Sequence, residues 1–363
     1  MNPLTGIYGA ATALRNTLYD RGVLPSHRLE QPVVSVGNLS AGGSGKTPFV
    51  IALGELLKAR GIRFDVLSRG YGRKTRGLLL VEKDGSAADF GDEPLLIARR
   101  LDVPVIVGES RYEGGRVAER KFQPQLHILD DGFQHRSLAR DFDIVLLTEH
   151  DFTDWLLPSG RLREPLASLQ RADAIGLARD FSGAAFENTS KQGKHVPQGL
   201  KSEHSQAPIG TAEAVPYPKP DSETSSGKKS AIDHFVRQGK LVWRIERELV
   251  LPNLPSAPIV FCGIARPQQF FAQVRATGVT PAAEVEFRDH HAYDGSDIEC
   301  LLAMRGKLSA GGFLTTEKDA VNLGRLQTEL KPLAVATLRL RFDHPTDVVD
   351  AILARIRERR PRS

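Results

Sequence analysis

The chain has 363 residues, with 49 Lys and Arg against 44 Asp and Glu, so its formal net charge is +5. Its 40% of hydrophobic residues excludes wholesale disorder, and its length predicts two domains or one large domain with insertions. The mild positive charge is compatible with a nucleotide, a phospholipid or a nucleic acid as partner and does not choose among them.

Cysteine content and hydropathy indicate a cytosolic protein. The two cysteines, Cys262 and Cys300, cannot form a disulfide framework, and no CxxC metal spacing occurs. Cys262 follows an apolar run and is expected to be buried. We expect no transmembrane helix, because no apolar run reaches about 18 residues, and no signal peptide.

Residues 3–20 are predicted to form an amphipathic helix. Its apolar positions recur at helical spacing, and three arginines lie beside or after them. The pattern alone leaves two alternatives: a helix packed on the protein's own core, or a helix lying in a membrane interface. The apolar positions are Leu4, Ile7, Tyr8, Ala11, Leu14 and Leu18, and the arginines are Arg15, Arg21 and Arg28.

Short apolar runs that alternate with helical patterns follow, which predicts an α/β fold with a parallel sheet covered by helices on both faces. A Ser-, Gly-, Lys- and Pro-rich stretch over 181–240 is predicted to be a disordered insertion. From Leu241 a second, smaller α/β unit is expected, in which Ser296 and Glu299 cap a helix. The predicted strands are 32–36, 64–67, 103–107, 126–129, 144–147, 259–262, 313–314 and 334–340, and the predicted helices include 48–60 and one from Thr346.

The segment SVGNLSAGGSGKTPF, residues 35–49, predicts a phosphate-binding P-loop because it follows a strand and precedes a helix. Its glycines let backbone N–H groups point at a phosphate chain, Lys46 would reach the β- and γ-phosphates, and Thr47 offers a hydroxyl to Mg²⁺. The usual first glycine is replaced by Ser40, and partitioning ATPases carry a lysine where Ala41 stands. The predicted nucleotide-binding residues are Ser40, Ala41, Gly42, Gly43, Ser44, Gly45, Lys46 and Thr47.

Two acidic segments are candidates for chemistry. HILDDGFQH, residues 127–135, ends a predicted strand with Asp130 and Asp131, which suit Mg²⁺ at the carboxyl edge of a parallel sheet, although a loop cap gives the same pattern. In GDEP, residues 91–94, Asp92 is either a helix cap or a functional carboxylate.

Basic and imidazole side chains gather in three further segments. FRDHHAYDGSDI, residues 287–298, contains His290 and His291, and we expect only one of them to face a site, since neighbours on a strand point oppositely. Zinc is a weaker alternative, because no third ligand has the expected spacing. The arginines of 67–73 and 157–165 suit phosphate or sugar recognition, or belong to tight turns.

Eight segments in this order resemble the tetraacyldisaccharide 4′-kinases of lipid A biosynthesis and cover nearly the whole chain outside 181–240. They are SVGNLSAGGSGKTP, LSRGYGR, GDEPLL, DDGFQH, LPSGRLREP, GIARPQQFF, DHHAYDGSDI and TTEKDAVNL. The resemblance implies a P-loop NTPase-type core with a second α/β unit and a cleft between them. It divides the chain into 1–28, a membrane-surface helix, 29–180, the kinase core, 181–240, the insertion, and 241–363, the smaller unit.

The resemblance also implies the reaction and its residues. ATP with Mg²⁺ would phosphorylate the 4′-hydroxyl of an acylated disaccharide 1-phosphate at the cytoplasmic face of the bacterial inner membrane, which the N-terminal helix would touch peripherally. Asp92 would be the base, His290 or His291 would orient it, Lys46 would hold the phosphates, and Thr47, Asp130 and Asp131 would hold the metal. Substrate contacts would come from Arg69, Tyr71, Arg73, Glu93, Gln134 and Arg163.

Two other functions explain part of the pattern. A partitioning-type ATPase switch accounts for the glycine-rich loop but not for the DHHAYD and LPSGRLREP segments. A nucleic-acid-binding module is motivated only by the basic charge, without interleaved aromatic and basic residues, and we expect no nucleic-acid partner.

Overall fold

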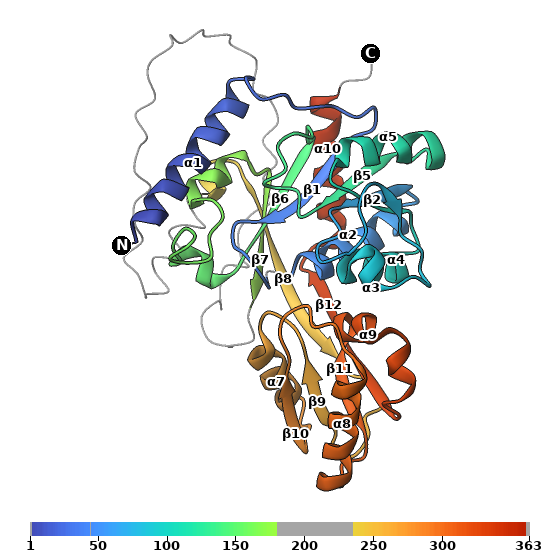
Figure 1. Ribbon diagram of the computed structural model, residues 1–363. Helices are drawn as coiled ribbons and strands as arrows, with labels where there is room; N and C mark the ends of the chain where they lie inside the picture. The colour runs from blue at the N-terminus through green and yellow to red at the C-terminus, as the bar shows by residue number, and fades with distance from the viewer. Residues whose placement is uncertain (1, 44, 180–234, 361–363) are drawn as a thin grey trace.

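The computed structural model describes residues 2–43, 45–179 and 235–360. In these ranges the chain forms one twelve-stranded, mostly parallel sheet flanked by helices (Figure 1), so the predicted α/β class is confirmed. The strand order is β10-β9-β11-β12-β8-β7-β6-β1-β5-β2-β4-β3. None of the helices in the described part of the chain is long and apolar enough to cross a bilayer.

The elements follow the predicted order, with boundaries shifted by a few residues. The helices are α1 (Pro3–Asp20), α2 (Lys46–Ala59), α3 (Ala87–Phe90), α4 (Asp92–Leu101), α5 (Arg111–Phe122), α7 (Pro267–Ala276), α8 (Gly295–Leu308), α9 (Glu317–Leu323) and α10 (Pro345–Arg359). The strands are β1 (Val33–Asn38), β2 (Phe64–Ser68), β3 (Leu79–Leu80), β4 (Val105–Val107), β5 (Leu126–Asp130), β6 (Phe142–Leu147), β7 (Ala174–Arg179), β8 (Leu241–Val250), β9 (Ile259–Cys262), β10 (Ala283–Glu286), β11 (Phe313–Thr316) and β12 (Leu333–Phe342).

Strand β1 lies in the middle of the N-terminal part of the sheet, between β5 and β6, and pairs in parallel with both. Every residue of these three strands is buried, because helices cover both faces. Alternate side chains enter two separate cores: Val34 packs in the cluster that includes α2, and Val33 in the cluster that includes α5 residues. The carboxyl ends of the strands therefore meet along one buried, rigid edge.

The C-terminal strands continue this sheet instead of forming a separate one. The ten-residue strands β8 and β12 pair antiparallel over Thr337↔Val250 to Phe342↔Ile245, while β8 also pairs in parallel with β7. Strand β12 then pairs with β11, and β11 with β9. The two parts are thus joined by shared hydrogen-bonded strands; the domain boundaries inferred from the sequence stay a prediction.

Two details of the sequence prediction need correction or restriction. Helix α8 is capped by Asp294 with Asp297, not by Ser296 with Glu299, because the helix begins at Gly295. The predicted insertion 181–240 lies outside the described residues except for 235–240, where Phe235 is buried in a core cluster. Cys262 is fully buried, as predicted.

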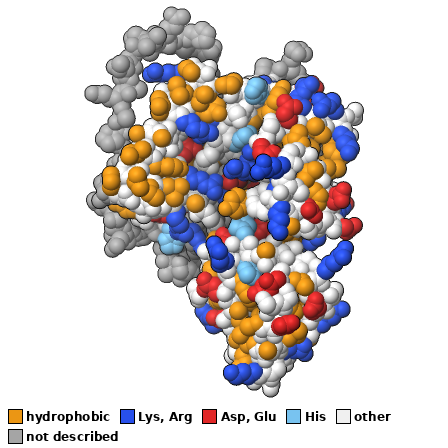
Figure 2. Space-filling view, viewed as in Figure 1, with side chains coloured by type: hydrophobic (Ala, Val, Ile, Leu, Met, Phe, Trp, Pro, Cys, Tyr) orange, Lys and Arg blue, Asp and Glu red, His pale blue; other side chains and the backbone are white. Residues whose placement is uncertain are grey.

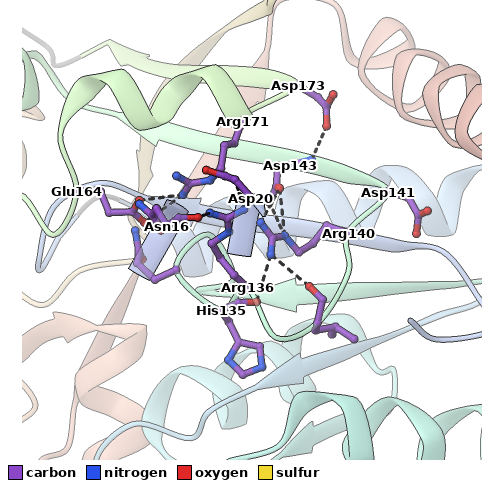
Figure 3. Close-up of polar contacts among 12 residues, drawn as sticks. Asn16, Asp20, His135, Arg136, Arg140, Asp141, Asp143, Glu164, Arg171 and Asp173 are labelled. Atoms are coloured by element: carbon purple, nitrogen blue, oxygen red, sulfur yellow. Dashed lines mark hydrogen bonds and ion pairs between the residues drawn. The ribbon is translucent and has the colours of Figure 1, made fainter. Parts of the chain in front are cut away.

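Helix α1 is held to the protein by hydrogen bonds from its side chains. Thr5 Oγ1 lies 2.5 Å from Ser159 Oγ, the Tyr8 hydroxyl donates to the Arg163 carbonyl at 3.0 Å, and Asn16 donates to Glu164 at 2.7 Å. Figure 3 shows Asn16 and Asp20 meeting partners from the loop region beyond β5 and β6. Part of the apolar stripe faces outward: Leu4, Ile7 and Leu14 are 56–66% exposed, whereas Tyr8 and Leu18 are half-buried.

The arginines near this helix do not all face outward. Arg15 donates to the Gln134 carbonyl at 2.7 Å, and Arg28 forms an ion pair with Asp141 at 2.8 Å. Arg21 is exposed at the end of the helix. Arg15 is therefore turned toward the protein, whereas Arg21 and Arg28, whose side chain is 55% exposed, lie at the surface.

Candidate active site

The loop between β1 and α2 has the backbone shape of a phosphate cradle. Gly42, Gly43 and Gly45 have φ values of 81°, 41° and 82°, which residues with a Cβ rarely adopt. Gly45 is the N-cap of α2, so the free N–H groups of the first helical turn and the helix dipole point at the loop. Ser44, also predicted to bind nucleotide, lies outside the described residues.

Lys46 and the acidic pair lie together because β1 and β5 are neighbours, with Val36 in register with Asp130. The Lys46 ammonium is 3.1 Å from Asn38 Oδ1 and 3.5 Å from Asp131 Oδ1. The two segments approach closely: a Cβ on Gly37 would lie 2.5 Å from the Phe133 Cβ, so glycine is required there. The predicted combination of P-loop lysine and strand-end carboxylates therefore exists in space.

Asp130 is buried among negative groups. Its Oδ2 accepts a hydrogen bond from Ser68 Oγ at 2.9 Å, while its Oδ1 is buried with no hydrogen-bond partner among the residues that the structure describes. Burial, together with the nearby charges of Glu93 and Asp131, raises the pKa of Asp130 to about 7. A cation bound here would satisfy the oxygen and offset this charge.

The residues present fit a magnesium ion. Asp130 offers its buried Oδ1, and Thr47 stands in the first turn of α2 with a buried side chain. In the described ranges no three His, Cys, Asp or Glu side chains cluster closely enough to form a full ligand set. Mg²⁺ suits such a site, because it keeps several waters and takes further ligands from substrate phosphates. Asp131 fits less directly, since Lys46 and Arg163 lie against its carboxylate.

A second carboxylate, Asp92, lies at the start of α4 and is only 4% exposed. Its Oδ1 accepts from the Glu93 backbone N–H at 2.8 Å, and its Oδ2 lies 2.9 Å from His290 Nδ1 and 3.2 Å from Asn322 Nδ2. Helix α9, which carries Asn322 and Lys318, follows β11 and packs on α4 (Figure 1). It thereby brings residues of the C-terminal part of the chain to Asp92. Gly91, not Asp92, is the N-cap, so the simple capping alternative is wrong.

The surroundings of Asp92 favour its ionised form. Burial raises the pKa of Asp92, but the hydrogen bond from His290, the charge of Lys318 and the hydrogen bond from Asn322 outweigh it, and the net pKa is lowered. Glu93 behaves oppositely: burial raises its pKa despite the charges of Lys318 and Lys46. Because Glu93 interacts with both lysines, it links the P-loop side of the site to the Asp92 side.

Only one of the two adjacent histidines reaches Asp92. His290 does so, from a turn after β10 where its φ is 58°. His291 Nε2 lies 2.8 Å from Asp297, and its ring stacks on Phe287 at 4.8 Å. Neither histidine lies on a strand, so the reason given from the sequence is wrong although the expectation of a single facing histidine fits the geometry.

The predicted substrate residues fall into two groups. Tyr71, Glu93, Gln134 and Arg163 lie at the site: the Tyr71 ring, 66% exposed, is 5.3 Å from the His290 ring, and Gln134 donates to the Asn38 carbonyl. Arg73 is used differently. Its guanidinium binds the Gly77 carbonyl and Glu109, which ties down the 69–77 loop.

Sequence reasoning named only Arg69 as a site residue from a cluster of cations that lies next to the acidic pair and missed the others. His135 is surrounded by Arg15, Arg69, Arg111 and Arg140; burial first, then these charges, lower the pKa of His135 to about 4, so it is neutral at pH 7. Arg111 is 8% exposed and begins α5, just beyond the carboxyl end of β4. Its position shortly after the predicted strand 103–107 could have indicated a residue at the carboxyl edge of the sheet. Figure 2 shows Lys and Arg side chains gathered across the middle of this face, and Figure 3 shows His135 beside Arg136 and Arg140.

Lys318 and Asn322 were also missed as site residues. Both lie in the TTEKDAVNL segment, which the sequence analysis used only for resemblance. They are one helical turn apart on α9, which places both side chains on the face that packs against α4. The sequence shows the four-residue spacing of Lys318 and Asn322, but it does not show that α9 packs against α4.

Comparisons with known proteins point to one family. The family model of tetraacyldisaccharide-1-P 4′-kinases matches residues 1–357. The tetraacyldisaccharide 4′-kinase of Koribacter versatilis is 44% identical and that of Geobacter metallireducens 34%, covering 99% and 95% of this chain and 99% and 94% of theirs. The crystal structure of LpxK from Aquifex aeolicus in complex with ATP has a TM-score of 0.69 at 30% identity and covers 98% of both chains. The chain therefore belongs to the tetraacyldisaccharide-1-P 4′-kinase family.

Proposed function

We propose how the residues of this chain carry out the reaction of its family, the ATP-dependent phosphorylation of the 4′-hydroxyl of a tetraacyldisaccharide 1-phosphate. The observation that carries the assignment is the position of Asp92. It is a buried, ionised carboxylate, bound by His290, that is linked through Glu93 to the P-loop lysine. A hydroxyl placed between Asp92 and the γ-phosphate would meet a proton acceptor on one side and the phosphate cradle on the other.

ATP binding is assigned to the β1–α2 loop, and the ATP complex of the Aquifex aeolicus relative supports it. The loop amides and Lys46 hold the β- and γ-phosphates, and the first turn of α2 adds its positive end. Asp130 and Thr47 would hold Mg²⁺, which when bound neutralises negative charge on the phosphates. Arg163 keeps Asp131 oriented toward Lys46.

Asp92 accepts the proton of the attacking 4′-hydroxyl. Its lowered pKa keeps it ionised at neutral pH, so the acceptor is present in nearly every molecule, at the cost of a weaker base. A weak base suffices here, because phosphoryl transfer depends mainly on positioning and on neutralisation of charge. His290 and Asn322 fix the carboxylate so that one oxygen stays aligned.

The cation cluster around His135 supplies positive charge for the phosphate that the substrate already carries. Arg69 and Arg111 are the members we assign to this contact, since Arg69 is exposed and Arg111 stands at a helix N-terminus. Tyr71 offers an exposed aromatic face for a sugar ring beside His290.

We place the protein at the cytoplasmic face of the inner membrane, held peripherally by α1. Leu4, Ile7 and Leu14 form an exposed apolar face of α1, and hydrophobic side chains, in orange, gather in the upper left of Figure 2, where Figure 1 shows α1. Trp155, 49% exposed, shortly precedes the residues 159–164 that α1 contacts. An aromatic side chain at such a surface suits the headgroup level of a bilayer. The occupant of this surface is lipid, because an acylated substrate stays in the bilayer and α1 is bonded to the loop that flanks the P-loop.

Transfer of the γ-phosphoryl group from labelled ATP to a tetraacyldisaccharide 1-phosphate in detergent micelles tests the function. Label at the 4′-position is expected with the native chain and with the control Asp84→Asn, an exposed acid outside the site. Lys46→Ala should give no product. Label released only as inorganic phosphate, whether or not the lipid is present, would refute the kinase and favour an ATPase.

A further inference from the structure

Lys318 connects the two residues of the Asp92–His290 pair to a third group. Its ammonium lies 3.0 Å from Asp289 Oδ1, 3.2 Å from His290 Nε2 and 3.8 Å from Asp92 Oδ2. Its side chain is only 18% exposed, so the three contacts are made largely out of water. A charge placed in this way acts on both members of the pair at once.

The contact with His290 decides which ring nitrogen carries a proton. An ammonium has only hydrogen-bond donors, so His290 Nε2, 3.2 Å away, has to accept with its lone pair. A neutral imidazole then carries its proton on Nδ1, the atom 2.9 Å from Asp92 Oδ2. In this tautomer His290 donates a hydrogen bond to Asp92 and stabilises its negative charge. The carboxylate then stays unprotonated and can accept the proton of the substrate hydroxyl.

Charges around His290 act in opposite directions. The hydrogen bond to Asp92 raises the pKa of His290, burial and the charge of Lys318 lower it, and the charge of Asp289 raises it, so that the net pKa is raised. Glu93 and the neutral ring of Tyr71 are the other groups near His290. The 3.2 Å contact between the Lys318 ammonium and His290 Nε2 opposes a proton on that nitrogen, because two cations do not share a hydrogen bond.

The helix that carries Lys318 is fixed to the histidine turn by its neighbour Asp319, which is fully buried. The Asp319 carboxylate accepts from the Gly263 N–H at 2.7 Å, from the Tyr293 hydroxyl at 2.8 Å and from Thr316 Oγ1 at 2.5 Å. The Gly263 carbonyl in turn accepts from the His290 N–H at 3.1 Å. The Asp319 carboxylate therefore ties the start of α9 to Gly263 and Tyr293, and these two residues hold the turn that carries His290.

We infer that Lys318 is a positioning residue for phosphoryl transfer: it holds His290 in the neutral, Nδ1-protonated tautomer that orients Asp92, while Asp319 fixes the distance between Lys318 and His290. This inference rests on the proposed role of Asp92 as the proton acceptor. Neither residue touches the reacting atoms; both act through His290.

Kinetics give the first test. Lys318→Met should lower kcat by about 10- to 100-fold, the range in which loss of alignment acts, and leave KM for ATP within about twofold. Lys318→Arg keeps a charged donor and should recover part of the loss, and Asp319→Asn should lower kcat in the same way. Lys307→Met, an exposed lysine of the same part of the chain, is the matched control and should be neutral. A kcat within twofold of the native value for Lys318→Met would overturn the inference.

The second test needs no activity and therefore separates this inference from the proposed function. Two-bond ¹H–¹⁵N spectra of histidine-labelled protein report the protonation of each ring nitrogen, and His290→Gln identifies the signal among ten histidines. In native protein at pH 7.5, His290 should show protonated Nδ1 and unprotonated Nε2. In Lys318→Met it should be doubly protonated, with circular dichroism showing an intact fold. A native Nε2–H form, or an identical His290 titration with and without Lys318, would refute the inference.

Discussion

Replacing Ile7 and Leu14 together by serine tests whether α1 binds lipid through its outward face. The two side chains are 66% and 61% exposed, so the protein itself buries little of them. Full burial of such a side chain is worth about 1.5–3 kcal/mol, and the exposed share of the pair corresponds to about 2–4 kcal/mol. Partition into vesicles should therefore fall by roughly 30- to 1,000-fold.

Sedimentation with anionic phospholipid vesicles measures this loss directly. Leu308→Ser, an apolar side chain 43% exposed at the end of α8, is the matched control and should leave partition unchanged. Thermal unfolding of the double variant should be unaffected, because neither side chain packs in the core. Native vesicle partition in the double variant, or a large drop in its thermal stability, would show that the face does not bind lipid.

Three further outcomes follow from the geometry. Lys46→Met should reduce kcat more than removal of the catalytic base does, since charge neutralisation dominates phosphoryl transfer; equal losses in a phosphoryl-transfer assay would contradict this. Gly37→Ala places a Cβ 2.5 Å from the Phe133 Cβ and should lower the free energy of unfolding by about 1–3 kcal/mol in urea and weaken ATP binding, whereas Gly306→Ala, with open space around it, should do neither. Burial lowers the pKa of His127, but its buried contacts with Asp65 and Glu119 outweigh burial and the net pKa is raised. The contribution of these contacts to stability is therefore complete below about pH 6.5 and is lost as the pH rises through the folded-state pKa; the destabilisation by His127→Gln should be larger at pH 6 than at pH 8, and the reverse order in urea melts would refute the assignment.

The α/β core could be predicted because its strands are buried on both faces. Runs such as those of β1 and β6 are continuous and apolar, and the glycine-rich loop marks the strand edge where phosphate binds. Strands β8 and β12 were harder to interpret. They mix charged and apolar residues, Arg247 with Glu248 and Arg339 with Leu340, because they bridge the two parts of the sheet and are only partly covered.

The candidate site was predictable where residues are close in sequence. Lys46 and Thr47 follow from one motif, and the strand-end carboxylates from another. The partners of Asp92 come from about 200 residues away. Lys318 and Asn322 reach it because α9 packs on α4, and His290 reaches it from the turn after β10. The packing of α9 on α4 depends on the pairing of β8 with β12, which joins the two parts of the sheet. The spacing of residues within one segment carries no information about this packing.

The outward face of α1 shows the same limit. Helical periodicity located the stripe, but a stripe indicates only that apolar residues share a side, not which surface covers it. The polar contacts of Thr5, Tyr8 and Asn16 decide its orientation, and their partners lie in residues 159–164.

The most direct test of the account is a single-turnover measurement on Asp92→Asn, with enzyme in excess over lipid and labelled ATP bound in advance. The account predicts that ATP affinity stays within about twofold of the native value, while the rate of label transfer to the 4′-hydroxyl falls by about 10²- to 10⁴-fold, the usual range for loss of a general base. A transfer rate equal to that of the native chain would contradict the role of Asp92 as proton acceptor.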